Sequence, residues 1–355
     1  MPRTGTKPAS AKFGKLIARF PGRRIGVVGD WMLDRYIWGT ASRLSPEAAV
    51  PVVEFTKRTE CLGGGGNVAA NLAALGARVE AFGVIGDDED GKALLGAMRS
   101  LKLPSAGIVA DSERPTSLKM RIIARHQQVV RVDQESKFPL DAKIEWKLSR
   151  KILKAIPKLD ALIVSDYDKG VVTDGLIDPV LAACVRKKVP VFVKPKWSRL
   201  PSYRGATAIV CNRAEAGFLV TRTLDSDASV EDACRALLAH FNCSAVVITR
   251  GERGLSVYEE DAQDVFHIAA TSRERPIGQH GEARSARGSE VYDVTGAGDT
   301  VLATLALAVA TGASMRDAAI LGNAAAGIVV TKLGTATLSP AELIVAARGA
   351  GPVSH

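Results

Sequence analysis

The chain has 355 residues, 46% hydrophobic and 24% charged, the composition of an ordinary soluble globular protein with one large α/β domain or two smaller ones. The net charge of +9 comes from residues 1–24 and 271–288, so a basic face is not required and we expect no nucleic-acid partner. The five cysteines are scattered, which argues against disulfides and a zinc site, and no apolar run reaches the ~18 residues of a membrane helix. We therefore expect a cytoplasmic protein without a membrane partner.

Residues 1–23 form a basic N-terminal extension that lacks the apolar core of a signal peptide. Within it Phe13, Leu16, Ile17 and Phe20 recur at helical spacing. This pattern predicts a short amphipathic helix that docks on the body of the protein.

From residue 24 to residue 349, short apolar runs alternate with helical patterns. The apolar runs predict buried strands at 24–29, 79–85, 161–165, 190–194, 207–211 and 244–249. The helical periodicity predicts helices at 66–76, 89–101, 141–155, 174–188, 213–221, 229–241, 297–311, 314–332 and 339–348. This alternation predicts a single α/β domain with a doubly wound, mostly parallel sheet flanked by helices.

Three segments depart from this pattern. Residues 36–56 and 117–133 alternate polar and apolar side chains, which predicts strands with one wet face in a small sheet outside the main one. Such a sheet could act as a lid over a site. Residues 271–288 are polar, contain glycine and lack periodicity, so we expect a mobile loop there.

The segment 290–312, EVYDVTGAGDTVLATLALAVATG, places a Gly-Ala-Gly turn and an acid before an apolar helix. Gly296 and Gly298 would let a phosphate approach the unpaired N–H groups of the helix start. An acid there repels phosphate, but Asp299 makes sense as a base that takes a proton from an attacking hydroxyl. The alternative is an ordinary turn with a capping acid.

Two further motifs contain candidate ligands for a polyol. Residues 61–76, CLGGGGNVAANLAALG, place four glycines before Asn67, and the alternative is a flexible turn before a packed helix. Asp30 and Asp34 follow the first predicted strand, where ligands bind in such folds, and the alternative is a pair of solvated loop acids.

Two other strand ends contain candidate nucleotide ligands. Asn212 and Glu215 could reach a phosphate–metal cluster, or they could form a helix capping box. Thr249, Gly251 and Gly254 form a polar turn suited to nucleotide phosphates, or a hairpin loop.

The DVTGAGD run at 293–299 and the glycine–asparagine run at 63–67 together resemble the two signatures of the ribokinase-like (PfkB-type) carbohydrate kinases. The segments GDWMLDRYIWG, SRLSPEAAVPVV, SDYDKG and NAAAGIVVTKLGTAT are similar to the heptose 7-phosphate kinase branch of that family. Because the sequence contains no His-x-Gly-His nucleotidyl-transfer motif, we expect a stand-alone kinase.

The resemblance implies a ribokinase-like fold with a β-sheet lid and a homodimer formed through the lid. It implies ATP and Mg²⁺ as cofactors and phosphorylation of the anomeric hydroxyl of D-glycero-β-D-manno-heptose 7-phosphate, a step toward lipopolysaccharide. Asp299 would be the base, and Gly296, Ala297 and Gly298 would form the anion hole. Alternatives are a kinase of the same fold for another sugar or nucleoside, and a catalytically weak sugar- or nucleotide-binding homologue.

The resemblance also implies two sets of binding residues. For the nucleotide they are Asn212, Glu215, Thr249, Gly251, Gly254 and Asn323, with Mg²⁺ carried mainly by ATP and Glu215 as its candidate protein neighbour. Lys194 and Lys196 are further candidates for the nucleotide, proposed from their place at a strand end and not from the resemblance. For the sugar they are Asp34, Gly64, Gly65 and Asn67, in addition to Asp30 from the strand-end argument, with Arg131 and Lys169 as candidates for the sugar's own phosphate.

One strand end departs from the family. Heptose kinases usually have Asp-Pro-Lys where this chain has Lys194-Pro195-Lys196. The lost acid could weaken Mg²⁺ handling, or the added cation could bind the nucleotide phosphates directly. Alternatively, Lys194 turns outward to solvent. The two lysines are expected to repel each other in an empty site.

Overall fold

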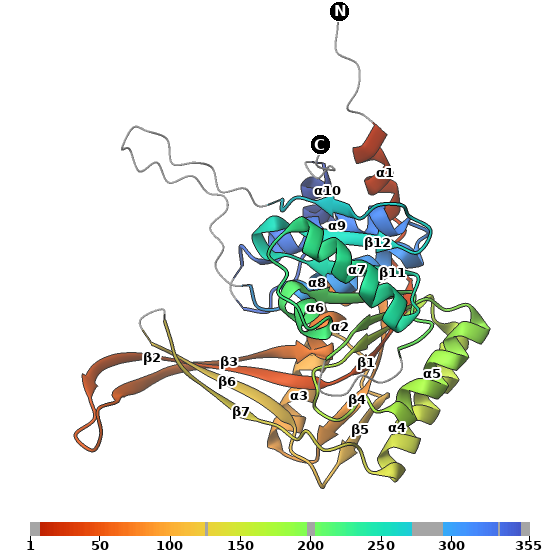
Figure 1. Cartoon of the computed structure of the whole chain (residues 1–355). Coiled ribbons are helices and arrows are strands. Elements are labelled where there is room, and N and C mark those ends of the chain that lie inside the picture. Colours follow the sequence, from red (N-terminus) through yellow and green to blue (C-terminus); the bar gives the residue numbers. More distant parts are fainter. Residues whose placement is uncertain (1–7, 125–126, 197–202, 272–293, 333, 349–355) are drawn as a thin grey trace, which may run out of the picture.

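The computed structural model describes residues 8–124, 127–196, 203–271, 294–332 and 334–348. Most of the chain folds around a nine-stranded sheet of order β13-β12-β11-β10-β9-β8-β1-β4-β5 (Figure 1). The strands are β1 (Arg24–Gly29), β4 (Arg78–Gly86), β5 (Ile108–Asp111), β8 (Ala161–Ser165), β9 (Val191–Lys194), β10 (Ala208–Asn212), β11 (Ala245–Thr249), β12 (Leu255–Glu259) and β13 (Phe266–Ile268). The strands from β11 to β5 pair in parallel, whereas β12 and β13 are antiparallel. The expected doubly wound, mostly parallel sheet is confirmed.

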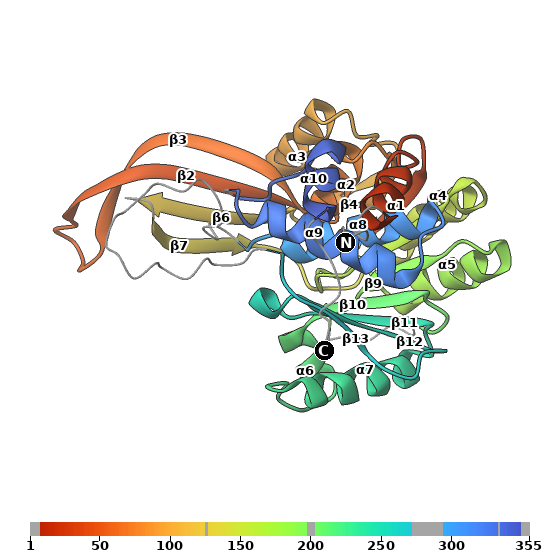
Figure 2. The same ribbon diagram turned by 90° about the horizontal axis from the view of Figure 1, so that it is seen from above.

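Helices cover both faces of this sheet. The helices are α1 (Pro8–Ile17), α2 (Gly65–Ala74), α3 (Glu89–Ser100), α4 (Ala142–Ala155), α5 (Asp174–Lys187), α6 (Arg213–Leu219), α7 (Asp227–Phe241), α8 (Ala297–Ala310), α9 (Met315–Val329) and α10 (Pro340–Ala347). Figure 2 shows α9 and α10 on one side of the sheet and α6 and α7 on the other. Alternate residues of each central strand enter the two cores, as Val27 and Val28 do, which explains the continuous apolar runs.

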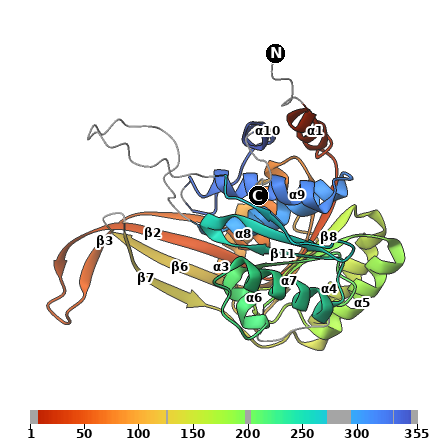
Figure 3. The same cartoon turned by 45° about the horizontal axis from the view of Figure 1, so that its top comes forward.

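The N-terminal helix docks as its spacing predicts. Phe13, Leu16, Ile17 and Phe20 are all buried in the core that also contains α8 and α9, and α1 packs beside α10 (Figure 3). This burial stabilises the segment, because each such side chain contributes roughly 1.5–3 kcal/mol when removed from water.

A second sheet of four strands extends from the body (Figure 1). Its order is β3-β2-β6-β7, formed by β2 (Trp31–Leu44), β3 (Pro51–Gly64), β6 (Ser117–Ala124) and β7 (Gln127–Gln134). The expected small sheet is confirmed, but the range 36–56 is too short. Residues 31–35 and 57–64 continue its two strands, and their ends near the body are buried, so the alternating pattern disappears there.

The predicted loop at 271–288 lies outside the described residues except for Thr271. In the part of the chain that the structure describes, no helix has the length and apolarity needed to cross a membrane. All five cysteines have free thiols.

Candidate active site

The start of α8 is built by a glycine in a left-handed conformation. Gly296, the residue before the helix, has φ 82°, and a Cβ there would lie 2.5 Å from Asn67 Nδ2. A side chain at this position would therefore be strained and would collide with α2. A Cβ on Gly298 would lie 3.7 Å from Lys194 Nζ, so the ammonium group lies against the first turn of α8.

The carboxylate of Asp299 is buried among three donors from other elements. Asn67 Nδ2 donates to Oδ2 at 3.0 Å, whereas the Tyr167 hydroxyl and Lys194 Nζ donate to Oδ1 at 2.6 and 2.7 Å. Only 3% of Asp299 is exposed. No side chain among the described residues caps the helix at Gly296, so the interpretation of Asp299 as a capping acid is wrong.

Lys194 points into this cluster, so its interpretation as a solvent-facing side chain is wrong. Only 14% of the side chain is exposed, and Nζ donates to the Tyr167 hydroxyl at 2.8 Å as well as to Asp299. Burial lowers the pKa of Lys194, but the carboxylate of Asp299 outweighs burial and the pKa is raised. Lys196 has its own partner, Glu215 Oε1 at 2.6 Å, so the expected repulsion between the two lysines is offset.

Tyr167 is a site residue to which the sequence analysis gave no role. It lies in the SDYDKG segment, two residues after β8, and burial and the charge of Asp299 both raise the pKa of its hydroxyl. The phenol therefore stays protonated and donates to the carboxylate. Because ligands in such folds bind beyond the carboxyl ends of strands, the place of Tyr167 after β8 in the sequence could have indicated a site residue.

Two buried acids hold the loops that present these side chains. Asp30 accepts backbone N–H bonds from Tyr167, Lys169 and Val171 at 2.7–3.3 Å, and burial raises its pKa. Asp30 is thus occupied by the 167–171 turn, and its contact with a sugar stays a prediction.

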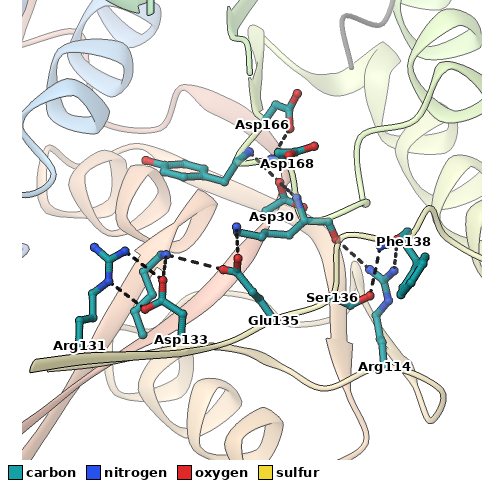
Figure 4. A network of polar contacts seen from close by, with 12 residues as sticks. Asp30, Arg114, Arg131, Asp133, Glu135, Ser136, Phe138, Asp166 and Asp168 are labelled. Carbon is teal, nitrogen blue, oxygen red and sulfur yellow. Dashed lines mark hydrogen bonds and ion pairs between the residues drawn. The ribbon is translucent and has the colours of Figure 1, made fainter. Parts of the chain in front are cut away.

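The second acid, Asp166, lies beside Asp30 at the end of β8 (Figure 4). It accepts from the Tyr203 hydroxyl at 2.9 Å and from the Asp168 and Lys196 N–H groups at 2.8 and 3.4 Å. Burial and the charge of Asp30 raise the pKa of Asp166 to about 7. The two acids therefore connect the turns that carry Tyr167 and Lys196.

This acid pair makes stability depend on pH. Folded Asp166 keeps its proton up to about pH 7, whereas the unfolded chain releases it near pH 4. Unfolding therefore releases a proton in that window, and the free energy of unfolding is expected to fall as pH rises from about 4 to about 7. Asp166→Asn, which cannot ionise, should reduce the slope in urea unfolding between these pH values. The exposed Asp178→Asn on α5 is the control, and an equal slope in wild type and D166N would contradict the assignment.

The glycine run packs against the acids that follow β1. A Cβ on Gly63 would lie 2.4 Å from Asp34 Oδ2, and Gly64, with φ 56°, leaves a Cβ position only 2.5 Å from the Asp30 carbonyl. Gly65 begins α2, and its first turn carries Asn67. The glycines are buried and closely packed, so the interpretation as a flexible turn is wrong.

Asp34 faces a cation that the sequence analysis did not single out. Arg121 Nη1 of β6 lies 2.5 Å from Asp34 Oδ1, and its guanidinium lies 5.2 Å from the Tyr36 ring centre. Burial raises the pKa of Asp34 although Arg121 opposes this. The interpretation of Asp34 as a solvated loop acid is therefore wrong.

A row of ion pairs runs from the lid to the body (Figure 4). Lys169 Nζ lies 2.6 Å from Glu135 Oε1, and Lys119 contacts both Glu135 and Asp133. Arg131 pairs with Asp133 at 2.9 Å and has 49% of its side chain exposed. In the described structure Arg131 contacts Asp133 and is connected to Lys169 through the other members of this row. Lys169 itself lies in the turn that Asp30 holds.

The remaining candidates for the nucleotide lie at the ends of the neighbouring strands β10 and β11 and on helix α9. Asn212 and Glu215 form the capping box that was the alternative interpretation, and Glu215 also binds Lys196. Thr249 ends β11, and Gly251 and Gly254 shape the hairpin loop to β12, closed by an Arg250 N–H bond to the Gly254 carbonyl at 2.7 Å. Asn323 of α9 donates to the Ala269 carbonyl at 2.7 Å. The structure thus confirms the two local motifs without testing their nucleotide roles.

Comparison with known proteins places these features in one family. The model of the pfkB family carbohydrate kinases matches residues 23–342. Among curated proteins, the "Bifunctional protein HldE" of Geobacter metallireducens is 44% identical over 318 residues, and that of Mesorhizobium japonicum is 40% identical over 349 residues. These alignments cover 90% and 98% of this chain and 61% and 67% of the relatives, so the chain spans about three-fifths to two-thirds of their length.

Solved structures show the same fold. Arabidopsis thaliana ribokinase, in complex with ribose and ATP, aligns with a TM-score of 0.69 at 16% identity over 92% of this chain and 99% of the ribokinase chain. Escherichia coli phosphofructokinase-2, in complex with potassium, aligns with a TM-score of 0.69 at 17% identity over 91% of this chain and 97% of its own. With the family model matching most of its length, this chain belongs to the pfkB family of carbohydrate kinases.

Proposed function

We propose that the protein transfers the γ-phosphoryl group of ATP to the anomeric hydroxyl of D-glycero-β-D-manno-heptose 7-phosphate, as a step in lipopolysaccharide precursor synthesis in the cytoplasm. The observation that carries the proposal is the buried Asp299 at the start of α8, held by Asn67 and Tyr167 from two other segments. The resemblance of the GDWMLDRYIWG and SRLSPEAAVPVV segments to heptose 7-phosphate kinases supports the substrate, as does the identity of 40–44% to proteins named "Bifunctional protein HldE".

In this reaction the sugar hydroxyl gives its proton to Asp299 while its oxygen attacks the γ-phosphorus. The bond between that phosphorus and the β–γ bridging oxygen breaks, and ADP leaves. The N–H groups of Gly296, Ala297 and Gly298 at the helix start bind the phosphoryl oxygens, and the Ala297 N–H has to give up its 3.2 Å bond to the Val294 carbonyl to do so. Asn67 donates to Oδ2 and so fixes the direction of the base.

The nucleotide occupies the ends of β9, β10 and β11. Lys194 and Lys196 face the phosphates, Asn212 and Glu215 lie beside them, and Thr249 begins the turn of Gly251 and Gly254. We place Asn323 near the base or ribose. This placement is supported by the sheet order, in which β9, β10 and β11 are neighbours, so that their ends lie side by side.

Magnesium fits this site as an ion carried by ATP. Among the described residues, no three His, Cys, Asp or Glu side chains gather as a metal site. Both oxygens of Glu215 are already engaged, by Lys196 Nζ and the Asn212 N–H group. Bound with ATP, Mg²⁺ neutralises charge on the phosphates.

The sugar lies between the glycine run and the lid. Asp34, Gly64 and Gly65 line its side toward α2, with Asp30 behind them. Lys169 is placed to bind the 7-phosphate, and Arg131 reaches it only if the lid closes. The direct test measures ADP release with heptose 7-phosphate, fructose 6-phosphate, ribose and a nucleoside. Preference for another acceptor would overturn the substrate, and no turnover with any would favour a binding protein.

The lid is expected to close over the sugar. Strands β2, β3, β6 and β7 should exchange amide hydrogens more slowly when heptose 7-phosphate and a non-hydrolysable ATP analogue are bound, because closure excludes water from the site. Hydrogen exchange followed by mass spectrometry measures this, with α7 as an internal control. Protection confined to the main sheet would contradict a closing lid.

The lid also supports a homodimer. It exposes the large apolar side chains Leu44, Val50, Phe55, Val130 and Val132, with 66% of Phe55 accessible to solvent. Such a surface favours contact with a second copy. Phe55→Glu is expected to shift the protein toward monomer in sedimentation velocity, and an unchanged species would argue against this interface.

A further inference from the structure

We propose that Lys194 is a built-in phosphoryl ligand that exchanges partners during the reaction. In the empty site it neutralises Asp299, and when ATP binds it turns to the γ-phosphoryl group and releases the base. The inference rests on the proposed phosphoryl transfer, but it does not depend on which sugar is the acceptor.

The first argument is position. Lys194 Nζ lies 2.7 Å from Asp299 Oδ1 and 3.7 Å from the Cβ position of Gly298. The same ammonium group therefore lies against both the base and the helix turn proposed to hold the moving phosphoryl group. A change of side-chain torsion without backbone movement is enough to exchange one acceptor for the other.

The second argument is electrostatic. The start of α8 carries a partial positive charge, and the ammonium adds a full one, so two positive features meet at one point. Among the described residues, the carboxylate that contacts the ammonium is that of Asp299, and Glu215 acts on it from a greater distance. An ATP γ-phosphoryl group carries more negative charge and three acceptor oxygens, and it can therefore compete with Asp299 for the ammonium.

The third argument concerns the base. A carboxylate offers about four lone-pair sites, and Asn67, Tyr167 and Lys194 occupy three of those of Asp299. Tyr167 and Lys194 together therefore take both lone-pair sites of Oδ1, and the sugar hydroxyl finds no free site on that oxygen. Departure of Lys194 frees a site on Oδ1 at the moment when the phosphoryl group arrives. Tyr167 keeps its hydrogen bond and holds the carboxylate in place.

The test compares nucleotides rather than turnover. Calorimetric binding of ADP and of AMP-PNP, an ATP analogue with an imido bridge, is measured without Mg²⁺, because the two ligands differ by the γ-phosphoryl group. Lys194→Met is expected to weaken the binding of AMP-PNP by about 10- to 100-fold, which corresponds to the loss of a charge-assisted hydrogen bond. The binding of ADP should weaken by less than about 3-fold. The exposed Lys154→Met on α4 is the matched control and should change neither.

The Asp299→Asn variant distinguishes a lysine that moves from Asp299 to the phosphoryl group from a lysine that only neutralises Asp299. Freed from its ion pair, Lys194 should bind AMP-PNP several-fold more tightly in D299N than in wild type, with ADP nearly unchanged. Adding Lys194→Met to D299N should remove this gain. The double variant removes both charges of the Lys194–Asp299 pair and leaves neither unpaired. It can therefore be measured even if K194M alone does not fold.

The proposal would be overturned if K194M lost equal affinity for ADP and AMP-PNP, or if K194M had no effect on AMP-PNP binding in the D299N background. Either result describes a lysine that does not bind the γ-phosphoryl group. These assays contain no sugar. A failure of heptose 7-phosphate as acceptor would therefore leave this inference standing, and a failure here would leave the acceptor test intact.

Discussion

Asp299→Asn is expected to lower turnover by about 10²–10⁴-fold, the usual contribution of a general base. The amide retains the shape of the side chain and can still accept from Asn67 or Tyr167, so the fold should be kept, although the free energy of unfolding should fall because Lys194 loses its ion pair. Nucleotide binding should not weaken. What is lost is the ability to take the proton of the sugar hydroxyl. Steady-state rates at saturating ATP and sugar phosphate measure the effect, and circular dichroism checks the fold.

Asp317→Asn is the matched control for this variant. Asp317 also lies in the first turn of a helix, α9, where it pairs with Lys12 and accepts from Ser314. Losing its charge removes a comparable interaction with the helix dipole without touching the site. We expect wild-type turnover for D317N. A D299N enzyme with more than about a tenth of the wild-type rate would remove Asp299 from the role of base.

Gly296→Ala is expected to lower kcat/KM on the order of 10²-fold. The new Cβ would lie 2.5 Å from Asn67 Nδ2 and would require φ 82°, which L-residues rarely adopt. The helix start or Asn67 must move, and a shift of this size displaces the base from its acceptor. The left-handed conformation also costs about 1–3 kcal/mol, so the melting temperature should fall.

Gly96→Ala on α3 is the control for Gly296→Ala. It tests whether adding a methyl group to any helix glycine lowers kcat/KM and the melting temperature. A Cβ at Gly96 meets nothing within 4 Å, and alanine favours a helix, so this variant should match or exceed wild-type stability by about 0.5–1 kcal/mol with unchanged kinetics. If G296A were as active as G96A, the close packing of the helix start against Asn67 would have no catalytic role.

Much of the fold could be predicted from the sequence, because its signals are local. Continuous apolar runs of about five residues indicated β1, β8, β10 and β11 closely, and 3.6-residue periodicity located α4 and α7. Left-handed glycines and capping residues are likewise properties of short segments. The antiparallel β12 and β13 were missed, because the turn at Thr249–Gly254 was equally compatible with a phosphate loop and a hairpin.

The sequence by itself determined the α/β class, the separate small sheet and the Gly-Ala-Gly-Asp helix start, because each depends on neighbours in the chain. Only the tertiary structure decided what the polar side chains contact. Lys194 and Asp299 are 105 residues apart, and whether Lys194 turns inward depends on the packing of β9 beside α8. Tyr167 likewise reaches Asp299 only because Asp30 holds its turn. Directions of side chains beyond strand ends are set by such long-range contacts, which no local pattern records.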